Sequence, residues 1–418
     1  MIFKMYYQEL KDKILNNKAK VCVVGLGYVG FPLLQLLEKK KFHCIGIDTN
    51  KNKILELNNN KNNKNNLTSN YNFIKNSDVV IYSLPTPLNK KNNPDLKILK
   101  SSIRQSMKFF KDGQLIILES TSYPGTTKEC LISVIKKFEI GKNFFIGYSP
   151  ERIDPGNKTF NIENITKISS GYSEFCQNLT NIFYKKICKK VIRASTIEVA
   201  EFAKIYENIF RAVNIGLANE TKQISKKLKI DFNEVLNLAD TKPFGFMKFT
   251  PGPGVGGHCI PVDPFYLSWL AKKKKIKTKF IELSGKINSY MPVLICKEIK
   301  KYLIERIKKK NIKILILGLS YKKNIDDIRN SPSLKILLNL KNIFSKVEFE
   351  DRYIRKYKTK NKLLKSIKLK NYDLIENYDA IILATDHDYY NYNLIQKKSR
   401  LIFDLKNKFS KSSKVINL

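Results

Sequence analysis

The hydrophobic residues of the first 150 positions fall into short runs separated by polar or glycine-containing sequence. Runs of this length without polar alternation are typical of strands that are buried on both faces of a parallel sheet. A helical spacing of apolar residues follows the first run, over residues 31–40. The strands predicted in this way cover residues 20–24, 42–47, 78–84, 114–120 and 144–148.

The rest of the chain opens with a helical pattern over residues 196–228, which is long for a globular protein. Further helices are predicted at 231–240, 263–275 and 281–310, and further strands at 312–317, 347–350, 379–384 and 401–404. We therefore predict an α/β protein with two Rossmann-like doubly wound domains joined by a helical middle domain that contains one long helix. The predicted domains cover residues 1–195, 196–300 and 301–418.

A glycine motif follows the first predicted strand and precedes the first predicted helix. Its residues are Gly25, Leu26, Gly27, Tyr28, Val29 and Gly30. The next strand ends at Asp48, about 20 residues on, which completes the pattern of a dinucleotide-binding unit. Asp48 would bind the ribose hydroxyls and repel a 2′-phosphate, so the pattern predicts NAD rather than NADP.

The composition adds a very large positive charge. The 418 residues carry a formal net charge of +40, and lysine is spread along the whole chain together with asparagine. Such a charge is compatible with a nucleic-acid binder. Because no nucleic-acid-binding signature accompanies it, we favour a bias in base composition, and predict no specific nucleic-acid partner.

The seven cysteines have no paired spacing, which favours reduced thiols in the cytoplasm and argues against a metal site. The chain has no run of 18 apolar residues and no apolar signal core at its N-terminus. We therefore expect no metal, no membrane span and a cytoplasmic location.

Residues 251–267 are rich in glycine and proline and carry one cysteine, Cys259. Such a segment must be a loop, and a cysteine displayed by glycines is typical of a nucleophile. A tight turn with an incidental thiol is the alternative. Lys204 and Asn208 lie one turn apart in the long predicted helix and could face the same site, although Lys204 could also be one surface lysine among many.

Polar residues also follow two of the predicted strands, Thr121 after the fourth and Glu151 after the fifth. Ligands bind at the carboxyl ends of parallel strands, which makes both residues candidates for the site. A helix cap or a turn is the alternative interpretation of each.

Several motifs occur together and in order: GLGYVGFPLL at 25–34, PTP at 85–87, ESTSYPGTT at 119–127, YSPERIDPGN at 148–157, the helix with Lys204 and Asn208, PGPGVGGHCIPVDPFYL at 251–267 and YKKNIDDIRNSPS at 321–333. With these motifs the chain resembles the UDP-glucose/GDP-mannose dehydrogenase family over nearly its whole length. The forms at 148–157 and 256–267 look most like those of its UDP-N-acetylhexosamine 6-dehydrogenases.

The resemblance implies a four-electron oxidation of the sugar C6 alcohol to a carboxylate with two NAD⁺. It implies that Cys259 attacks the aldehyde, that Lys204 and Asn208 stabilise the oxyanion, and that Asp263, Glu151 and Thr121 assist proton transfer and hydrolysis. The implied cofactor-binding residues are those of the glycine motif with Asp48, Pro85, Thr86, Thr121 and Arg329. The implied substrate-binding residues are Glu151, Arg152, Lys204, Asn208, Gly256, Gly257, His258 and Lys322.

The substrate is predicted only by analogy. We favour UDP-N-acetylglucosamine, with UDP-N-acetylmannosamine, UDP-N-acetylgalactosamine and UDP-glucose as alternatives. Pro155 and Val262 differ from the residues usual in UDP-glucose enzymes, and an Asn/Lys-rich stretch at 58–66 replaces part of the family's usual connection. The long helix predicts a homodimer. A basic Rossmann-like protein that binds nucleic acid without catalysis is the remaining alternative.

Overall fold

The computed structural model describes residues 2–59, 66–154, 156–157, 159–359, 362–369 and 371–418. It divides into two compact units. Unit 1 comprises Met1–Glu207 and Phe265–Ile276, and unit 2 comprises Asn208–Pro264 and Lys277–Leu418. Among the described helices, none combines the length and the apolar character needed to cross a bilayer.

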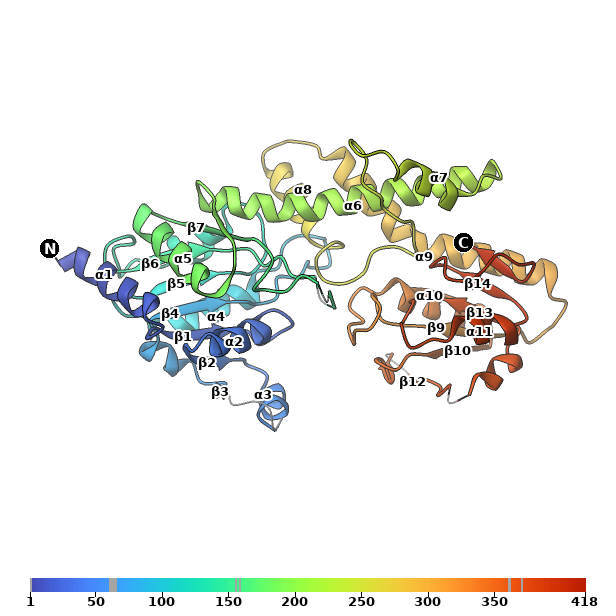
Figure 1. Ribbon diagram of the computed structural model, residues 1–418, viewed down its shortest axis with the longest axis horizontal. Helices are drawn as coiled ribbons and strands as arrows, with labels where there is room; N and C mark the ends of the chain where they lie inside the picture. Colours follow the sequence, from blue (N-terminus) through green and yellow to red (C-terminus); the bar gives the residue numbers. More distant parts are fainter. Residues whose placement is uncertain (1, 60–65, 155, 158, 360–361, 370) are drawn as a thin grey trace. The chain divides into compact units, whose positions relative to one another are not determined.

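Unit 1 is built on a sheet with the strand order β3-β2-β1-β4-β5-β6-β7-β8 (Figure 1). Its strands are β1 (Lys20–Val24), β2 (His43–Ile47), β3 (Asn66–Thr68), β4 (Val79–Tyr82), β5 (Leu115–Leu118), β6 (Phe145–Tyr148), β7 (Lys167–Gly171) and β8 (Val191–Arg193). The pairs are parallel except for β6 with β7. The order reverses between β1 and β4, which places a topological switch point at the end of β1.

The predicted strands of this sheet are confirmed. Every residue of β4, β5 and β6 is buried, because helices cover both faces of the sheet. The helices of this unit are α1 (Ile2–Leu15), α2 (Gly30–Lys39), α3 (Lys51–Asn58), α4 (Lys97–Met107) and α5 (Glu174–Ile187). The N-terminal helix α1 packs against α5. Most of the Asn/Lys-rich stretch at 58–66 lies outside the described residues.

Unit 2 contains a smaller parallel sheet with the order β10-β9-β13-β14-β15. Its strands are β9 (Lys313–Leu317), β10 (Lys346–Glu350), β13 (Ala380–Leu383), β14 (Ile402–Asp404) and β15 (Val415–Asn417), and α10 (Pro332–Lys341) and α11 (Tyr392–Lys398) accompany them. A short antiparallel pair, β11 (Lys356–Lys358) and β12 (Leu363–Lys365), follows β10 in the sequence. The second Rossmann-like pattern is therefore confirmed.

Helices occupy much of the middle of the sequence. They are α6 (Ile197–Lys227), α7 (Phe232–Ala239), α8 (Asp263–Lys273) and α9 (Lys279–Arg306). Asp231 caps α7 as predicted, and α6 matches the predicted span closely. The prediction that α9 extends to residue 310 is wrong. The backbone becomes extended at Ile307, and Lys309 in the segment that follows forms an ion pair with Asp379.

Candidate active site

The glycine motif forms the turn between β1 and α2, and its glycines are needed for different reasons. Gly25 has a φ of +97°, and a Cβ there would lie 2.4 Å from the Ser83 carbonyl oxygen. A Cβ at Gly30 would lie 1.9 Å from the carbonyl oxygen of Gly25. Both positions therefore need glycine for the turn itself. At Gly27 a Cβ would meet no atom within 4 Å, so this glycine leaves space for a ligand.

Asp48 follows β2 and faces this turn. Its Oδ2 accepts a hydrogen bond from the Leu26 amide at 3.0 Å and lies 3.6 Å from Nζ of Lys53. Val29 occupies the N-cap of α2, where its apolar side chain cannot accept the first helical amides. An open turn, a helix N-terminus without a side-chain cap and a half-buried carboxylate fit the pyrophosphate and ribose of NAD.

The segments after β4 and β5 are joined by side chains. Thr86 Oγ1 donates to the Thr121 carbonyl at 2.6 Å, and Ser120 Oγ accepts from the Leu84 amide at 2.8 Å. Pro85 is exposed, and Thr86 and Thr121 are half-buried. The structure therefore places these three predicted site residues together at the carboxyl edge of the sheet.

Glu151 is held by a buried lysine that sequence reasoning missed. Lys167 Nζ lies 2.9 Å from Glu151 Oε2 and 2.8 Å from Glu119 Oε1, and the Tyr184 hydroxyl donates to the same Glu119 oxygen at 2.6 Å. The other oxygen of Glu151 accepts from the amides of Arg152 and Ile153 at 2.7 Å each. Burial works to raise the pKa of Glu151, but Lys167 and these amides outweigh it and hold the pKa below its ordinary value.

The neighbouring Arg152 has two partners within unit 1. Its Nη2 lies 2.7 Å from Oε1 of Glu207, and its Nη1 donates to the Thr166 carbonyl at 2.7 Å. The structure therefore links the strand-end motif at 148–157 to helix α6. Pro155, on which part of the substrate prediction rests, lies outside the described residues.

Glu201 is a second carboxylate whose position the sequence did not reveal. It lies in α6, is 1% exposed, and accepts hydrogen bonds from the amides of Gly125 and Thr127 and from Thr127 Oγ1, at 2.5, 2.8 and 2.7 Å. Burial raises the pKa of Glu201 to about 7 in spite of these donors. The donors belong to the PGTT turn, so Glu201 fastens α6 to the segment that follows Thr121.

Lys204 lies one turn after Glu201 and is only 7% exposed. No ion-pair or hydrogen-bond partner of its ammonium is found among the described residues of unit 1. The interpretation of Lys204 as one surface lysine among many is therefore wrong. A largely buried lysine with no carboxylate beside its ammonium is typical of a site that receives an anionic ligand.

Asn208 lies one turn further along α6 and belongs to unit 2. Its side-chain amide donates to Oδ2 of Asp263 at 2.6 Å, and both side chains are buried. The carbonyl of Cys259 accepts from the amides of Val262 and Asp263, at 2.9 and 2.8 Å. Cys259, Asp263 and Asn208 are therefore brought together by one tight turn at the end of the cysteine loop.

The first part of the cysteine loop is held by two buried asparagines that the sequence analysis did not single out. Asn219 Oδ1 accepts from the Gly252 amide at 2.9 Å, and Asn219 Nδ2 donates to Asn288 Oδ1 at 3.1 Å. Asn288 Nδ2 donates in turn to the Ala212 carbonyl at 2.8 Å. The loop is therefore fastened to α6 and α9 within unit 2.

The glycines just before the cysteine pack against the C-terminal domain of the same unit. A Cβ at Gly256 or Gly257 would lie 2.4 or 2.9 Å from the side chain of Tyr321. The Gly257 amide donates to the Arg329 carbonyl at 2.8 Å, and its φ is +85°. Glycine is needed here because a larger residue would strike the tyrosine.

The remaining predicted residues of unit 2 lie around this contact. His258 and Lys322 are half-buried, and Lys322 follows Tyr321 directly. Arg329 is exposed, and its guanidinium forms two hydrogen bonds to Asp327 through Nε, at 2.9 and 3.1 Å. Unit 2 therefore assembles the cysteine, its polar neighbours and Lys322, while unit 1 assembles the glycine turn, Glu151 and Lys204.

Cys259 is more exposed than most of the other cysteines. The five cysteines Cys22, Cys130, Cys176, Cys188 and Cys296 are buried, and only Cys44 and Cys259 are half-buried. Burial raises the pKa of Cys44 and Cys130 to about 12, which leaves them as thiols. No disulfide joins the seven cysteines, all of which are described, and no described cluster of His, Cys, Asp and Glu could hold a metal ion.

Comparison with known proteins gives three matches to one family. Residues 19–188 match the NAD-binding domain of the UDP-glucose/GDP-mannose dehydrogenase family, residues 198–290 its central domain and residues 315–411 its UDP-binding domain. The chain is 36% identical to protein CapL of Staphylococcus aureus over 408 residues, which cover 92% of this chain and 95% of that protein.

Two further relatives carry substrate names. A UDP-N-acetyl-D-glucosamine 6-dehydrogenase of Pseudomonas aeruginosa is 33% identical over 93% of this chain and 96% of its own length. The solved structure of a UDP-D-ManNAc dehydrogenase from Pyrococcus horikoshii superposes with a TM-score of 0.84 at 30% identity, over 94% of this chain and 96% of that one.

Proposed function

We propose, because this chain belongs to the UDP-glucose/GDP-mannose dehydrogenase family, that it oxidises C6 of a UDP-N-acetylhexosamine to the carboxylate through a covalent bond to Cys259. The chain is an NAD-dependent nucleotide-sugar dehydrogenase. NAD, when bound, accepts the hydride of each oxidation step.

The observation that carries the proposal is that the Cys259 carbonyl accepts a hydrogen bond from the Asp263 amide, while the Asp263 carboxylate accepts one from Asn208. A thiolate can attack the C6 aldehyde to give a thiohemiacetal, and loss of a hydride from that carbon leaves a thioester. Water then cleaves the thioester and releases the carboxylate and the thiol. A covalent hold is needed because the aldehyde would otherwise escape between the two hydride transfers.

The roles of the surrounding side chains follow from their charge and burial. The Asn208 amide can donate to the oxyanion of the thiohemiacetal, and Asp263, which holds that amide, can take up a proton. We assign Lys204 the stabilisation of the same oxyanion and the binding of the substrate diphosphate. We assign Glu151 and Thr121 a role in assisting the attacking water. That Lys204 and Cys259 face one substrate stays a prediction, because they belong to different units.

The substrate within this class remains our proposal. We favour UDP-N-acetylglucosamine, because the motif forms around Glu151 and Cys259 resemble those enzymes and one relative bears that name. UDP-N-acetylmannosamine is the first alternative, because a relative of similar identity acts on it by name. Initial rates on a panel of UDP-N-acetylglucosamine, its manno and galacto epimers and UDP-glucose decide between them.

The stoichiometry tests the chemistry itself. We expect two NADH for each sugar consumed, measured by absorbance and by chromatography of the sugar nucleotide. One NADH per sugar, or release of free aldehyde, would contradict the covalent mechanism, and no oxidation of any sugar on the panel would contradict the proposed function.

We also propose a homodimer formed through α6. One side of this helix exposes apolar residues at helical spacing: Val199, Phe202, Tyr206, Phe210, Leu217 and Ile224. Apolar rows of this length are costly in water and are typical of an interface between chains. Light scattering should give twice the mass of 48.5 kDa, and Phe202→Glu with Leu217→Glu should reduce it to one chain. The cytoplasmic location stays a prediction.

A further inference from the structure

The two sheets contain the same glycine turn, one in each unit. The amide of Gly25 donates to the Ile47 carbonyl, and the amide of Gly318 donates to the Glu350 carbonyl, both at 2.8 Å. In each case an aspartate one residue after the second strand accepts the amide that follows the glycine. Asp351 accepts from Leu319 at 2.7 Å, as Asp48 accepts from Leu26.

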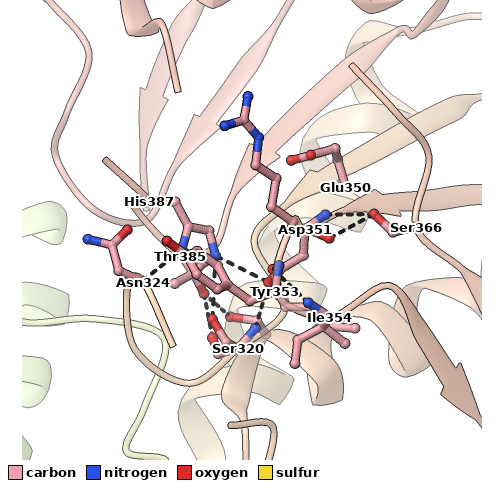
Figure 2. Close-up of polar contacts among 12 residues, drawn as sticks. Ser320, Asn324, Glu350, Asp351, Tyr353, Ile354, Ser366, Thr385 and His387 are labelled. Atoms are coloured by element: carbon pink, nitrogen blue, oxygen red, sulfur yellow. Dashed lines mark hydrogen bonds and ion pairs between the residues drawn. The ribbon is translucent and has the colours of Figure 1, made fainter. Parts of the chain in front are cut away.

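Asp351 differs from Asp48 in that its hydrogen-bonding capacity is used by the protein. Its Oδ2 accepts from the amides of Leu319 and Ser320, and its Oδ1 accepts from the amides of Tyr353 and Ile354. The side chain is 0% exposed, and His387 completes its surroundings (Figure 2). The carboxylate in the second turn therefore stabilises the protein's own backbone.

His387 is fixed in one tautomer and one orientation. Its Nδ1 accepts a hydrogen bond from the Asn324 amide at 2.9 Å, which places the ring proton of the neutral imidazole on Nε2. Nε2 lies 3.2 Å from Asp351 Oδ2 and 3.4 Å from Ser320 Oγ. The ring stacks on Tyr389 with centroids 5.2 Å apart, and the imidazole is 0% exposed.

These contacts hold both ends of one short segment, Ser320 to Asn324. Figure 2 shows Ser320, Asn324 and Thr385 around His387, and Thr385 Oγ1 donates to the Ser320 carbonyl at 2.6 Å. Asn324 has a φ of +62°, a strained conformation that its bonds to His387 and to the amide of Asp388 maintain. Between the two ends lie Tyr321, which packs against Gly256 and Gly257, and Lys322.

We propose that His387 is a positioning residue for the nucleotide sugar. It fixes the Ser320–Asn324 segment, and thereby Lys322, and through Tyr321 it fixes the glycines that precede Cys259. The inference rests on the proposed function in one respect, namely that the sugar nucleotide is bound by Lys322 and Cys259. That His387 immobilises these two segments does not depend on which substrate is bound.

Two variants and one matched control test the proposal. His387→Leu removes the hydrogen bond from the Asn324 amide and the contacts of Nε2 with Asp351 and Ser320. His387→Asn instead offers its Oδ1 as an acceptor near the position of Nδ1. Tyr378→Phe is the control, because it removes the hydrogen bond of a buried tyrosine to Glu348 in the same domain. We expect His387→Leu to raise KM for the UDP-sugar about tenfold without changing KM for NAD, and His387→Asn to recover most of the loss.

Hydrogen exchange measured by mass spectrometry gives a second result that does not need turnover. His387→Leu should accelerate exchange in peptides covering 319–325 and 254–261, while peptides covering β13 keep their protection. Faster exchange throughout the domain, or equal changes in Tyr378→Phe, would show that His387 is an ordinary core residue and overturn the proposal.

The two proposals fail in different ways. If the wild type oxidises no UDP-sugar, the proposed function fails, and the exchange pattern still decides whether His387 positions the two segments. If His387→Leu does not fold, the comparison of His387→Asn with Tyr378→Phe gives the decision: a selective change in KM or in exchange of these peptides supports the proposal, and its absence refutes it.

Discussion

The ammonium of Lys167 lies 2.9 Å from Oε2 of Glu151, and both side chains are shielded from solvent, with exposures of 0% and 7%. Lys167 is the first residue of β7, which pairs antiparallel with β6, and Glu151 lies just after β6 in the sequence. The same ammonium also pairs with Glu119, so one cation serves two buried carboxylates. The candidate hydrolytic carboxylate is therefore kept ionised by a residue that does not itself belong to any motif.

Lys167→Met should destabilise the protein strongly. Removal of the cation leaves two buried carboxylates, Glu119 and Glu151, with no positive charge beside them, which costs about 3–5 kcal/mol. Urea or thermal unfolding measures the loss, and Lys190→Met, which replaces an exposed lysine nearby, should change stability by less than about 0.5 kcal/mol. Equal stability of the two variants would show that the buried pairs contribute nothing.

Glu201 should make stability depend on pH in the direction opposite to that of an ion-paired acid. Its pKa is raised from 4.5 to about 7 by burial, so the folded chain binds more protons than the unfolded chain between these values. Its contribution is complete below pH 4.5 and is lost as the pH rises to about 7, by up to about 3 kcal/mol. Glu201→Gln should remove this slope, measured as Tm against pH. A slope that is the same in both proteins would contradict the assignment.

The glycines of the first turn should separate folding from cofactor binding. Gly27→Ala adds a methyl group where a Cβ meets no atom within 4 Å, so the variant should keep its Tm and bind NAD more weakly, by about tenfold or more. Gly30→Ala places the methyl group 1.9 Å from a carbonyl oxygen and should lower the Tm. Calorimetric titration with NAD and thermal unfolding check both. Unchanged NAD affinity in Gly27→Ala would remove the turn from the cofactor site.

Cys259→Ser should bind NAD and the sugar nucleotide with nearly unchanged affinity but lose turnover by at least about a thousandfold, because a serine hydroxyl is a poor nucleophile at this position. Cys44→Ser is the matched control, since Cys44 is the other half-buried thiol and lies on β2. NADH formation and equilibrium binding of both ligands provide the measurement. Near-normal rates in Cys259→Ser would mean that the nucleophile lies elsewhere.

Local patterns were sufficient for the architecture and for the NAD-binding turn. The strand, glycine turn, helix and Asp48 follow each other within about thirty residues, so backbone sterics and spacing alone predict the NAD site. The cysteine loop is likewise visible in the sequence, because its glycines and prolines exclude helix and strand over residues 251–261. The family resemblance supplied roles for residues whose spacing alone left alternatives open.

Contacts between distant segments were decided only by the tertiary structure. Lys167 beside Glu119, Glu201 beneath the PGTT turn, Tyr321 against Gly256 and His387 on Asp351 join residues that are 36 to 76 positions apart. No local propensity specifies such pairs. The polar pairs exist because a buried charge or polar group needs a partner, and the tyrosine lies on Gly256 because only glycine leaves room for its ring; the fold as a whole decides which segments meet.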